Sequence, residues 1–193
     1  MMTAQLVTPS FVSNIHRFTT QQYHLMHEAG VFAKGDRIEL VNGEIREMSP
    51  IGRKHAVCVA RATRFFQIKL GDRVFIWVQN PILLSDHSEP QPDLAILKWR
   101  DDFYAEALPA PDDILLIIEV ADSTIAYDRD VKSHLYAANG IPEMWLFDLN
   151  KKIVERYSQP SASGYKRIQR YEQNETLAML AFPDIVFNCE EIF

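Results

Sequence analysis

The stretch DDILLIIEVADSTIAYDRDVK, residues 112–132, contains an uninterrupted run of Ile and Leu that ends on an acid, Glu119. A continuous aliphatic run predicts a central strand that is covered on both faces of a sheet. An ionised carboxylate in an apolar setting costs several kcal/mol unless it is paired or binds a cation. Glu119 therefore requires a partner side chain or a metal ion.

Two other side chains are candidates to meet Glu119. Asp93 begins the preceding buried strand, directly after Pro92. Neighbouring strands can bring both carboxylates to one end of the sheet, at a separation that a shared divalent ion spans. Lys132 follows on the next helix, four residues beyond Asp128 and on the same helical face, from which its ammonium can reach back over the strand end.

Two carboxylates and a lysine are the groups that metal-assisted phosphodiester hydrolysis needs. A cation neutralises the phosphate and acidifies a bound water, while the lysine orients or deprotonates the nucleophile and offsets negative charge. The alternative is a structural ion pair of Glu119 with Lys132 or Arg129. Spacing alone leaves both interpretations open, because buried charges are enriched at functional sites without being confined to them.

The rest of the chain alternates helix and strand patterns. Asn42-Gly43 predicts a hairpin over residues 37–48, with Glu39 opposite Arg46 and Leu40 opposite Ile45. Helices are predicted over 19–30, 53–70 and 127–138, and strands near 73–79, 82–84, 93–99, 114–120, 143–149, 152–158 and 164–171. The helix 53–70 is assigned from the near-helical spacing of Val57, Ala60, Phe65 and Ile68. The C-terminal tail, rich in Leu, Phe and Ile, is expected to pack back on the body.

This order of elements predicts an α/β or α+β fold around one mixed sheet. Residues 1–17 show no periodicity and are interpreted as a flexible N-terminal arm, which leaves residues 18–193 as a single domain.

Composition limits the class of protein. A net charge of -6 argues against a protein that coats nucleic acid by bulk electrostatics, but it leaves room for a local basic site. No apolar run approaches the roughly 20 residues that cross a bilayer, and the first residues lack a secretory signal pattern, so we expect a cytoplasmic protein. Cys58 and Cys189 are far apart and outside any zinc-binding spacing, which predicts inert buried thiols.

Several segments resemble one known family. QPDLAIL, IIEVADST, YDRDVKSHLYAANGIPEMWLFDL and ELVNGEIREMSP, the last followed by His55, are similar to the Uma-two family of endonucleases in the PD-(D/E)XK restriction-endonuclease-like superfamily. The resemblance runs from about residue 19 to residue 187 and is most specific over residues 119–148. It implies a restriction-endonuclease-like core, in which a central mixed sheet is flanked by helices and preceded by an N-terminal helix and hairpin.

The resemblance also implies roles for single residues. Asp93 matches the aspartate of the motif and Glu119 its second acid, both as ligands for Mg2+, with Mn2+ as a substitute. The signature places lysine two residues after the second acid, where this chain has Ala121. The resemblance therefore assigns the catalytic lysine to Lys132, on the next helix. The implied substrate is DNA, and the implied assembly is a homodimer that cuts two strands with two subunits.

Three further residues, Glu44, His55 and Asp128, are accessory candidates. Glu39 and Glu44 match the ELxxGE element of the family; we expect Glu39 to organise the hairpin and leave the role of Glu44 open. His55 is a candidate for a phosphate contact, although a lone helical histidine is more often a capping or packing residue. Asp128 could pair with Lys132 and hold it in place.

The other hypothesis is a catalytically inactive descendant of the nuclease fold that serves as a nucleic-acid or protein binding module. The acidic net charge is the best argument for this alternative. The two hypotheses differ in whether Asp93 and Glu119 jointly bind a divalent ion.

Overall fold

The computed structural model describes residues 15–193. Most of the predicted arm, residues 1–14, lies outside the described residues. The helices are α1 (Thr20–Glu28), α2 (Arg53–Leu70), α3 (Ile125–Tyr127) and α4 (Ser133–Ala138), and a π-helical turn, η3 (Asp128–Lys132), joins α3 to α4. The strands are β1 (Ile38–Val41), β2 (Glu44–Glu47), β3 (Val74–Val78), β4 (Leu94–Lys98), β5 (Ile114–Ala121), β6 (Glu143–Asp148), β7 (Ile153–Ser161), β8 (Gly164–Tyr171), β9 (Thr176–Leu177) and β10 (Phe187–Asn188).

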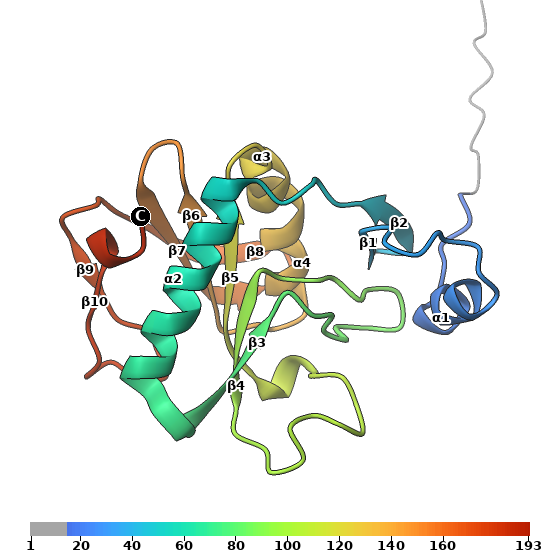
Figure 1. The fold of residues 1–193 in the computed structure, drawn as a ribbon, viewed down its shortest axis with the longest axis horizontal. Helices are drawn as coiled ribbons and strands as arrows, with labels where there is room; N and C mark the ends of the chain where they lie inside the picture. Colours follow the sequence, from blue (N-terminus) through green and yellow to red (C-terminus); the bar gives the residue numbers. More distant parts are fainter. Residues whose placement is uncertain (1–14) are drawn as a thin grey trace, which may run out of the picture.

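A six-stranded mixed sheet forms the centre of the molecule (Figure 1). Its strand order is β3-β4-β5-β6-β7-β8, and all neighbours are antiparallel except the parallel pair β5 and β6. The connection between the parallel strands runs through α3, η3 and α4, as a parallel crossover requires. The predicted mixed sheet, with the aliphatic run as an interior strand, is confirmed.

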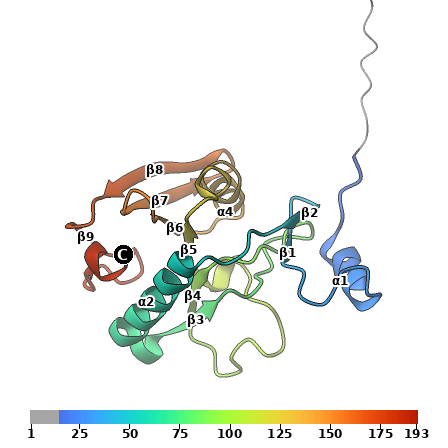
Figure 2. The same ribbon diagram turned by 45° about the horizontal axis from the view of Figure 1, so that its top comes forward.

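The two faces of the sheet carry different helices (Figures 1 and 2). Leu116, Ile118 and Val120 of β5 pack in the cluster that contains α2 and the C-terminal tail. Ile117 and Ala121 point to the other face, into the cluster that contains α4. Side chains alternate along a strand, so Glu119 belongs to the α4 face.

Helix α2 has the predicted bounds, but the residues whose spacing predicted it do not share one buried face. Phe65 is buried, whereas Val57 and Ile68 are 45% and 66% exposed. The buried residues are Cys58, Val59, Ala62, Phe65, Phe66 and Leu70. The helix carries apolar residues on more than one side, and only packing against the sheet selects the side that is covered.

The strand expected near residues 82–84 is absent from the described fold. Ile82 and Leu84 are buried in the cluster on the α4 face. Their backbone N–H groups donate to Pro90 and Ser88 within the same loop instead of to a sheet neighbour. The apolar pattern at these positions therefore reflects side-chain packing and not strand pairing.

The N-terminal part forms a separate small unit beside the sheet (Figure 1). Thr19 caps α1 in a capping box with Gln22. Strands β1 and β2 pair in the predicted register, with Glu39 opposite Arg46. The unit is attached to the loop before β4, because Leu40 and Glu89 form an antiparallel bridge.

The remaining expectations concern the tail and the cysteines. The tail packs back as predicted, since Met179, Phe187 and Ile192 are buried against the α2 face. Cys58 and Cys189 are both buried free thiols. No helix within residues 15–193 combines the length and apolar character needed to cross a membrane.

Candidate active site

A cleft of about 770 Å³ opens at the C-terminal end of β5. Its walls come from the β1–β2 hairpin, the N-terminus of α2 and the segment from Asp122 to Lys132. Asp93, Glu119 and Lys132 all line this cleft. The three candidate residues predicted from the sequence lie in three different parts of the chain, and the fold brings them to one cleft.

Glu119 is almost fully buried and has two polar partners on one oxygen. Its Oε1 accepts a hydrogen bond from the Tyr136 hydroxyl at 2.6 Å and lies 3.1 Å from Nζ of Lys132. Among the described residues, both contacts fall on Oε1, so Oε2 is the oxygen available to a ligand in the cleft. Burial raises the pKa of Glu119 to about 8, although the Lys132 ammonium acts in the opposite direction.

Lys132 ends the π-helical turn η3 and is also buried. Its Nζ lies between two carboxylates, 3.1 Å from Glu119 and 3.4 Å from Glu39. Burial by itself would lower the pKa of Lys132, but the surrounding carboxylates raise it well above its ordinary value. The ammonium therefore stays charged. Single π-helical turns occur frequently at functional sites.

Asp93 is fixed by three contacts from different elements. Its Oδ2 accepts the backbone N–H of Val120 at 2.9 Å and lies 3.0 Å from Nε2 of His55, while its Oδ1 accepts the Gln79 amide at 3.3 Å. Burial would raise the pKa of Asp93, but the hydrogen bonds from His55 and Val120 hold it below its usual range. The bond from Val120 also places Asp93 beside Glu119.

Glu39 is the residue that sequence reasoning placed only in the hairpin. It is buried, and besides Lys132 its carboxylate accepts the backbone N–H of Gln91 at 3.0 Å and the Tyr127 hydroxyl at 3.3 Å. A signal was present in the sequence, because Glu39 stands between Ile38 and Leu40 in a short apolar strand. The same cost of burying a carboxylate that singled out Glu119 applies to it.

The accessory candidates lie at the cleft in different ways. His55 contacts Asp93 from the first turn of α2. Glu44 pairs with Arg17 and Arg46 on the exposed side of the hairpin, and the hydrogen bond from Arg17 lowers its pKa. Asp128 accepts the Thr124 hydroxyl at 2.7 Å, and Lys132 pairs with Glu39 and Glu119 instead.

The comparisons with known proteins agree with this architecture. A family model described as "Uma2: Putative restriction endonuclease" matches residues 20–190. The chain belongs to the Uma2 family. No curated protein matches the sequence.

One solved structure resembles this Uma2 chain along almost its whole length. It is described as a "putative nuclease belonging to DUF820" from Anabaena variabilis. The two chains share 13% identity with a TM-score of 0.71, and the match covers 91% of this chain and 97% of the other. At this identity the likeness shows the fold alone, which confirms the nuclease-like core.

The donor set in the Uma2 chain fits a hard divalent cation. Glu39, Asp93, Glu119 and Asp128 all line the cleft, and Lys132 is shared by two of them. Within residues 15–193 no group of three or more His, Cys, Asp or Glu side chains is arranged to enclose a metal ion. Mg2+ commonly binds through one or two carboxylates and completes its shell with water and substrate phosphate. Asp93 and Glu119 are the residues that would hold it.

Proposed function

We propose that the protein is a Mg2+-dependent endonuclease that hydrolyses phosphodiester bonds in DNA. The observation that carries the proposal is the convergence of Asp93, Glu119 and Lys132 on one cleft of about 770 Å³. Asp93 and Glu119 are the metal ligands, and Lys132 is the catalytic lysine. Membership of the Uma2 family supports a nuclease activity of this kind.

The residues of the cleft have separate roles in the proposed reaction. A metal ion held by Asp93 and Glu119 would neutralise charge on the phosphate and acidify a water. Lys132 places a fixed positive charge next to Glu119, at the point where negative charge develops on the phosphate. Glu39 positions the ammonium from the opposite side. His55 positions Asp93 through the contact at 3.0 Å.

The test is nicking of supercoiled plasmid with Mg2+ or Mn2+, beside a single-stranded RNA of matched length. Wild type is compared with Asp93→Asn, Glu119→Gln and Lys132→Met, each checked for folding by circular dichroism. We expect each variant to lose at least a hundredfold in nicking rate, because removal of one positioned charged group typically costs 10²–10³. RNA is expected to be cut more slowly than DNA.

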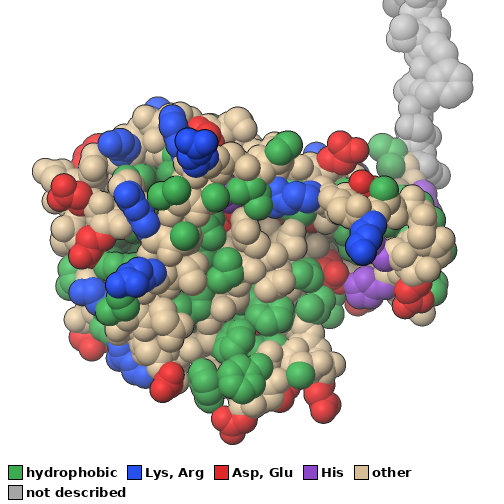
Figure 3. All heavy atoms as spheres, viewed as in Figure 1, with side chains coloured by type: hydrophobic (Ala, Val, Ile, Leu, Met, Phe, Trp, Pro, Cys, Tyr) green, Lys and Arg blue, Asp and Glu red, His purple; other side chains and the backbone are tan. Residues whose placement is uncertain are grey.

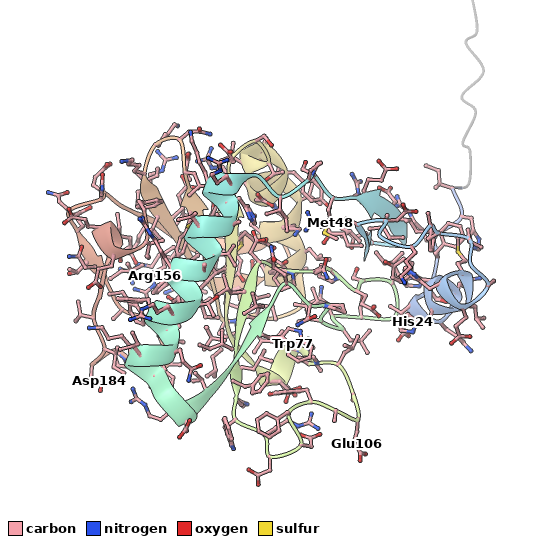
Figure 4. The ribbon with its side chains drawn as sticks, viewed as in Figure 1. His24, Met48, Trp77, Glu106, Arg156 and Asp184 are labelled. Atoms are coloured by element: carbon pink, nitrogen blue, oxygen red, sulfur yellow. The ribbon has the colours of Figure 1, made fainter. Side chains whose placement is uncertain are left out.

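Two control variants match the chemistry of these substitutions outside the cleft. Glu106→Gln removes a carboxylate in the exposed loop after β4, labelled in Figure 4, and Lys98→Met removes an exposed ammonium at the end of β4. Both are expected to keep wild-type nicking. A folded wild type that neither nicks nor binds Mn2+ in calorimetry would favour the inactive binding module instead.

We also propose that the protein acts as a homodimer, since cutting both strands of a duplex with one site per chain calls for two chains. Apolar side chains gather on the face around the loop that follows β4 (Figure 3). Among them, Trp99 and Phe103 are 41% and 55% exposed and lie edge to face with ring centroids 5.5 Å apart. Sedimentation equilibrium checks the proposal, and a monomer at micromolar concentration contradicts it.

A further inference from the structure

A second pocket, of about 680 Å³, lies directly beside the catalytic cleft. It is enclosed by α1, the β1–β2 hairpin and the segment from Gln79 to Gln91. Arg37, Met48, Ile51 and Gln91 line both the cleft and this pocket, so the two spaces are directly adjacent. Figure 4 shows Met48 between the hairpin and α2, and His24 at α1; both residues line the pocket.

Residues between the cleft and the second pocket donate hydrogen bonds to two carboxylates of the cleft, Asp93 and Glu39. Gln79 donates its side-chain amide to Asp93 Oδ1 at 3.3 Å, and the backbone N–H of Gln91 donates to Glu39 Oε2 at 3.0 Å. The two glutamines are joined, because the Gln91 amide donates to the Gln79 carbonyl at 2.8 Å. A ligand in the second pocket would therefore lie against the two glutamines, one of which contacts Asp93 through its side chain and the other Glu39 through its backbone.

Gln79 has a backbone conformation that side chains adopt only rarely, with φ of 49°. Residues held in the left-handed region cost free energy and cluster at functional sites. In this conformation Gln79 donates its backbone N–H to the Asp93 carbonyl and its side-chain amide to Asp93 Oδ1. Its own carbonyl accepts the side-chain amide of Gln91. The connection between pocket and cleft is thus fixed by the main chain as well as by side chains.

The pocket carries groups that recognise a nucleobase. Glu89 is buried, and its Oε2 lies 2.7 Å from Nε2 of His24. A carboxylate accepts from the exocyclic amino group of a base such as cytosine. His27 is exposed on α1, and its ring lies edge to face on the buried Tyr23 at 4.6 Å. An exposed ring held in this way can stack on an unpaired base.

We propose that the second pocket binds one unpaired nucleotide of the substrate strand, next to the scissile phosphate, and that Glu89 and His24 select a base with an exocyclic amino group. This inference rests on the proposed nuclease function. The volume of about 680 Å³ lies in the range of sites that hold one small molecule, which is the size of a single nucleotide. Arg37 lines both the cleft and this pocket.

The test measures binding of fluorescent single-stranded dC and dT 12-mers by anisotropy, at pH 8 in EDTA so that no strand is cut. We expect wild type to bind the dC strand at least fivefold more tightly than the dT strand. Glu89→Gln and His24→Ala are expected to bring this ratio close to one. His134→Ala, which removes an exposed histidine on α4, is the matched control and is expected to keep the wild-type ratio.

A wild-type ratio near one, or a ratio that the Glu89→Gln and His24→Ala variants leave unchanged, overturns the inference. Titration with deoxycytidine 5′-monophosphate provides a second readout, since the NMR signals of His24 and His27 must shift while the signal of His134 does not. The plasmid assay separates the two proposals. If wild type nicks the plasmid but binds the dC and dT strands equally, the nucleotide pocket is wrong and the nuclease proposal stands. If wild type prefers the dC strand through Glu89 but does not nick the plasmid, the nuclease proposal is wrong and the nucleotide-binding pocket stands.

Discussion

At the scale of single residues, the cleft is organised around one buried ammonium. Lys132 contacts Glu119 and Glu39, which come from β5 and β1. Each carboxylate is also held by a tyrosine hydroxyl, Tyr136 on Glu119 and Tyr127 on Glu39. Removing one member of such a buried group leaves uncompensated charge in an apolar setting.

Lys132→Met is therefore expected to lower the free energy of unfolding by about 3–5 kcal/mol. The measurement is urea unfolding in EDTA, followed by fluorescence and circular dichroism. Lys98→Met, at an exposed position, is the control and should stay within about 0.5 kcal/mol of wild type. An unchanged midpoint for Lys132→Met would show that the two carboxylates do not depend on the ammonium.

At the scale of elements, α1 depends on its cap because it is short and packs mainly through Tyr23. The Thr19 hydroxyl accepts the backbone N–H of Gln22, and the Gln22 side chain accepts the backbone N–H of Thr19. This reciprocal arrangement satisfies two donors at the helix start that have no other partner in the helix.

Thr19→Ala is expected to cost about 1 kcal/mol locally, which corresponds to roughly fivefold faster hydrogen exchange of the α1 amides. Exchange in β5 should not change. Thr20→Ala, which keeps the cap and adds a good helix former, is the matched variant. Equal exchange rates for α1 in Thr19→Ala and wild type would contradict the role of the cap.

Glu143, a buried acid at the start of β6, joins the C-terminal tail to the sheet. Its carboxylate accepts the backbone N–H of Leu180 at 2.6 Å and the indole N–H of Trp145 at 2.8 Å, and it pairs with Arg156 at 2.6 Å. Burial raises the pKa of Glu143 even though these partners act in the opposite direction.

This shift predicts how stability changes with pH. Because the folded-state pKa lies above the ordinary value of 4.5, the folded protein holds the proton more tightly than the unfolded chain. The contribution of Glu143 to stability is therefore complete below about pH 4.5 and is lost as the pH rises through the folded-state pKa. The advantage of wild type over Glu143→Gln in urea unfolding should fall across this window, by at most about 1.4 kcal/mol per pH unit. A constant or growing advantage contradicts the assignment.

At the scale of the whole molecule, a chain of net charge -6 must bind a polyanion through a local basic region. Arg53 and Lys54 are exposed in the first turn of α2, between Gly52 and His55 of the cleft wall. Lys166 and Arg167 are equally exposed but lie on β8, the outermost strand on the other side of β5. Under the proposed function, Arg53 and Lys54 lie next to the path of the substrate backbone, whereas Lys166 and Arg167 do not.

Replacing both Arg53 and Lys54 by Ala is expected to weaken duplex binding and to reduce the slope of log K against log salt by about 2. The measurement is anisotropy of a labelled duplex in EDTA over a range of NaCl concentrations. The matched double variant, Lys166→Ala with Arg167→Ala, should keep the wild-type slope. Equal slopes for the two double variants would place the substrate elsewhere.

Most of the fold could be predicted from local signals. Asn42-Gly43 set the hairpin register, Thr19 and Gly30 bounded α1, and the aliphatic run of β5 marked the interior of the sheet. The error arose where burial depends on distant partners: Ile82 and Leu84 matched a strand but pack from a loop. The spacing of Val57 and Ile68 identified α2 correctly, although both side chains face solvent.

The sequence by itself determined which residues need partners: an acid that ends an aliphatic strand must be compensated, and this fact singled out Glu119 before any contact was known. Only the tertiary structure decided which partners meet. Glu39 reaches Lys132 from a separate hairpin, and Gln79 contacts Asp93 from the segment after β3. The distance along the chain between these partners hides both contacts. Strand alternation fixes the face on which a side chain lies, but the element that covers this face is selected by packing of the whole chain.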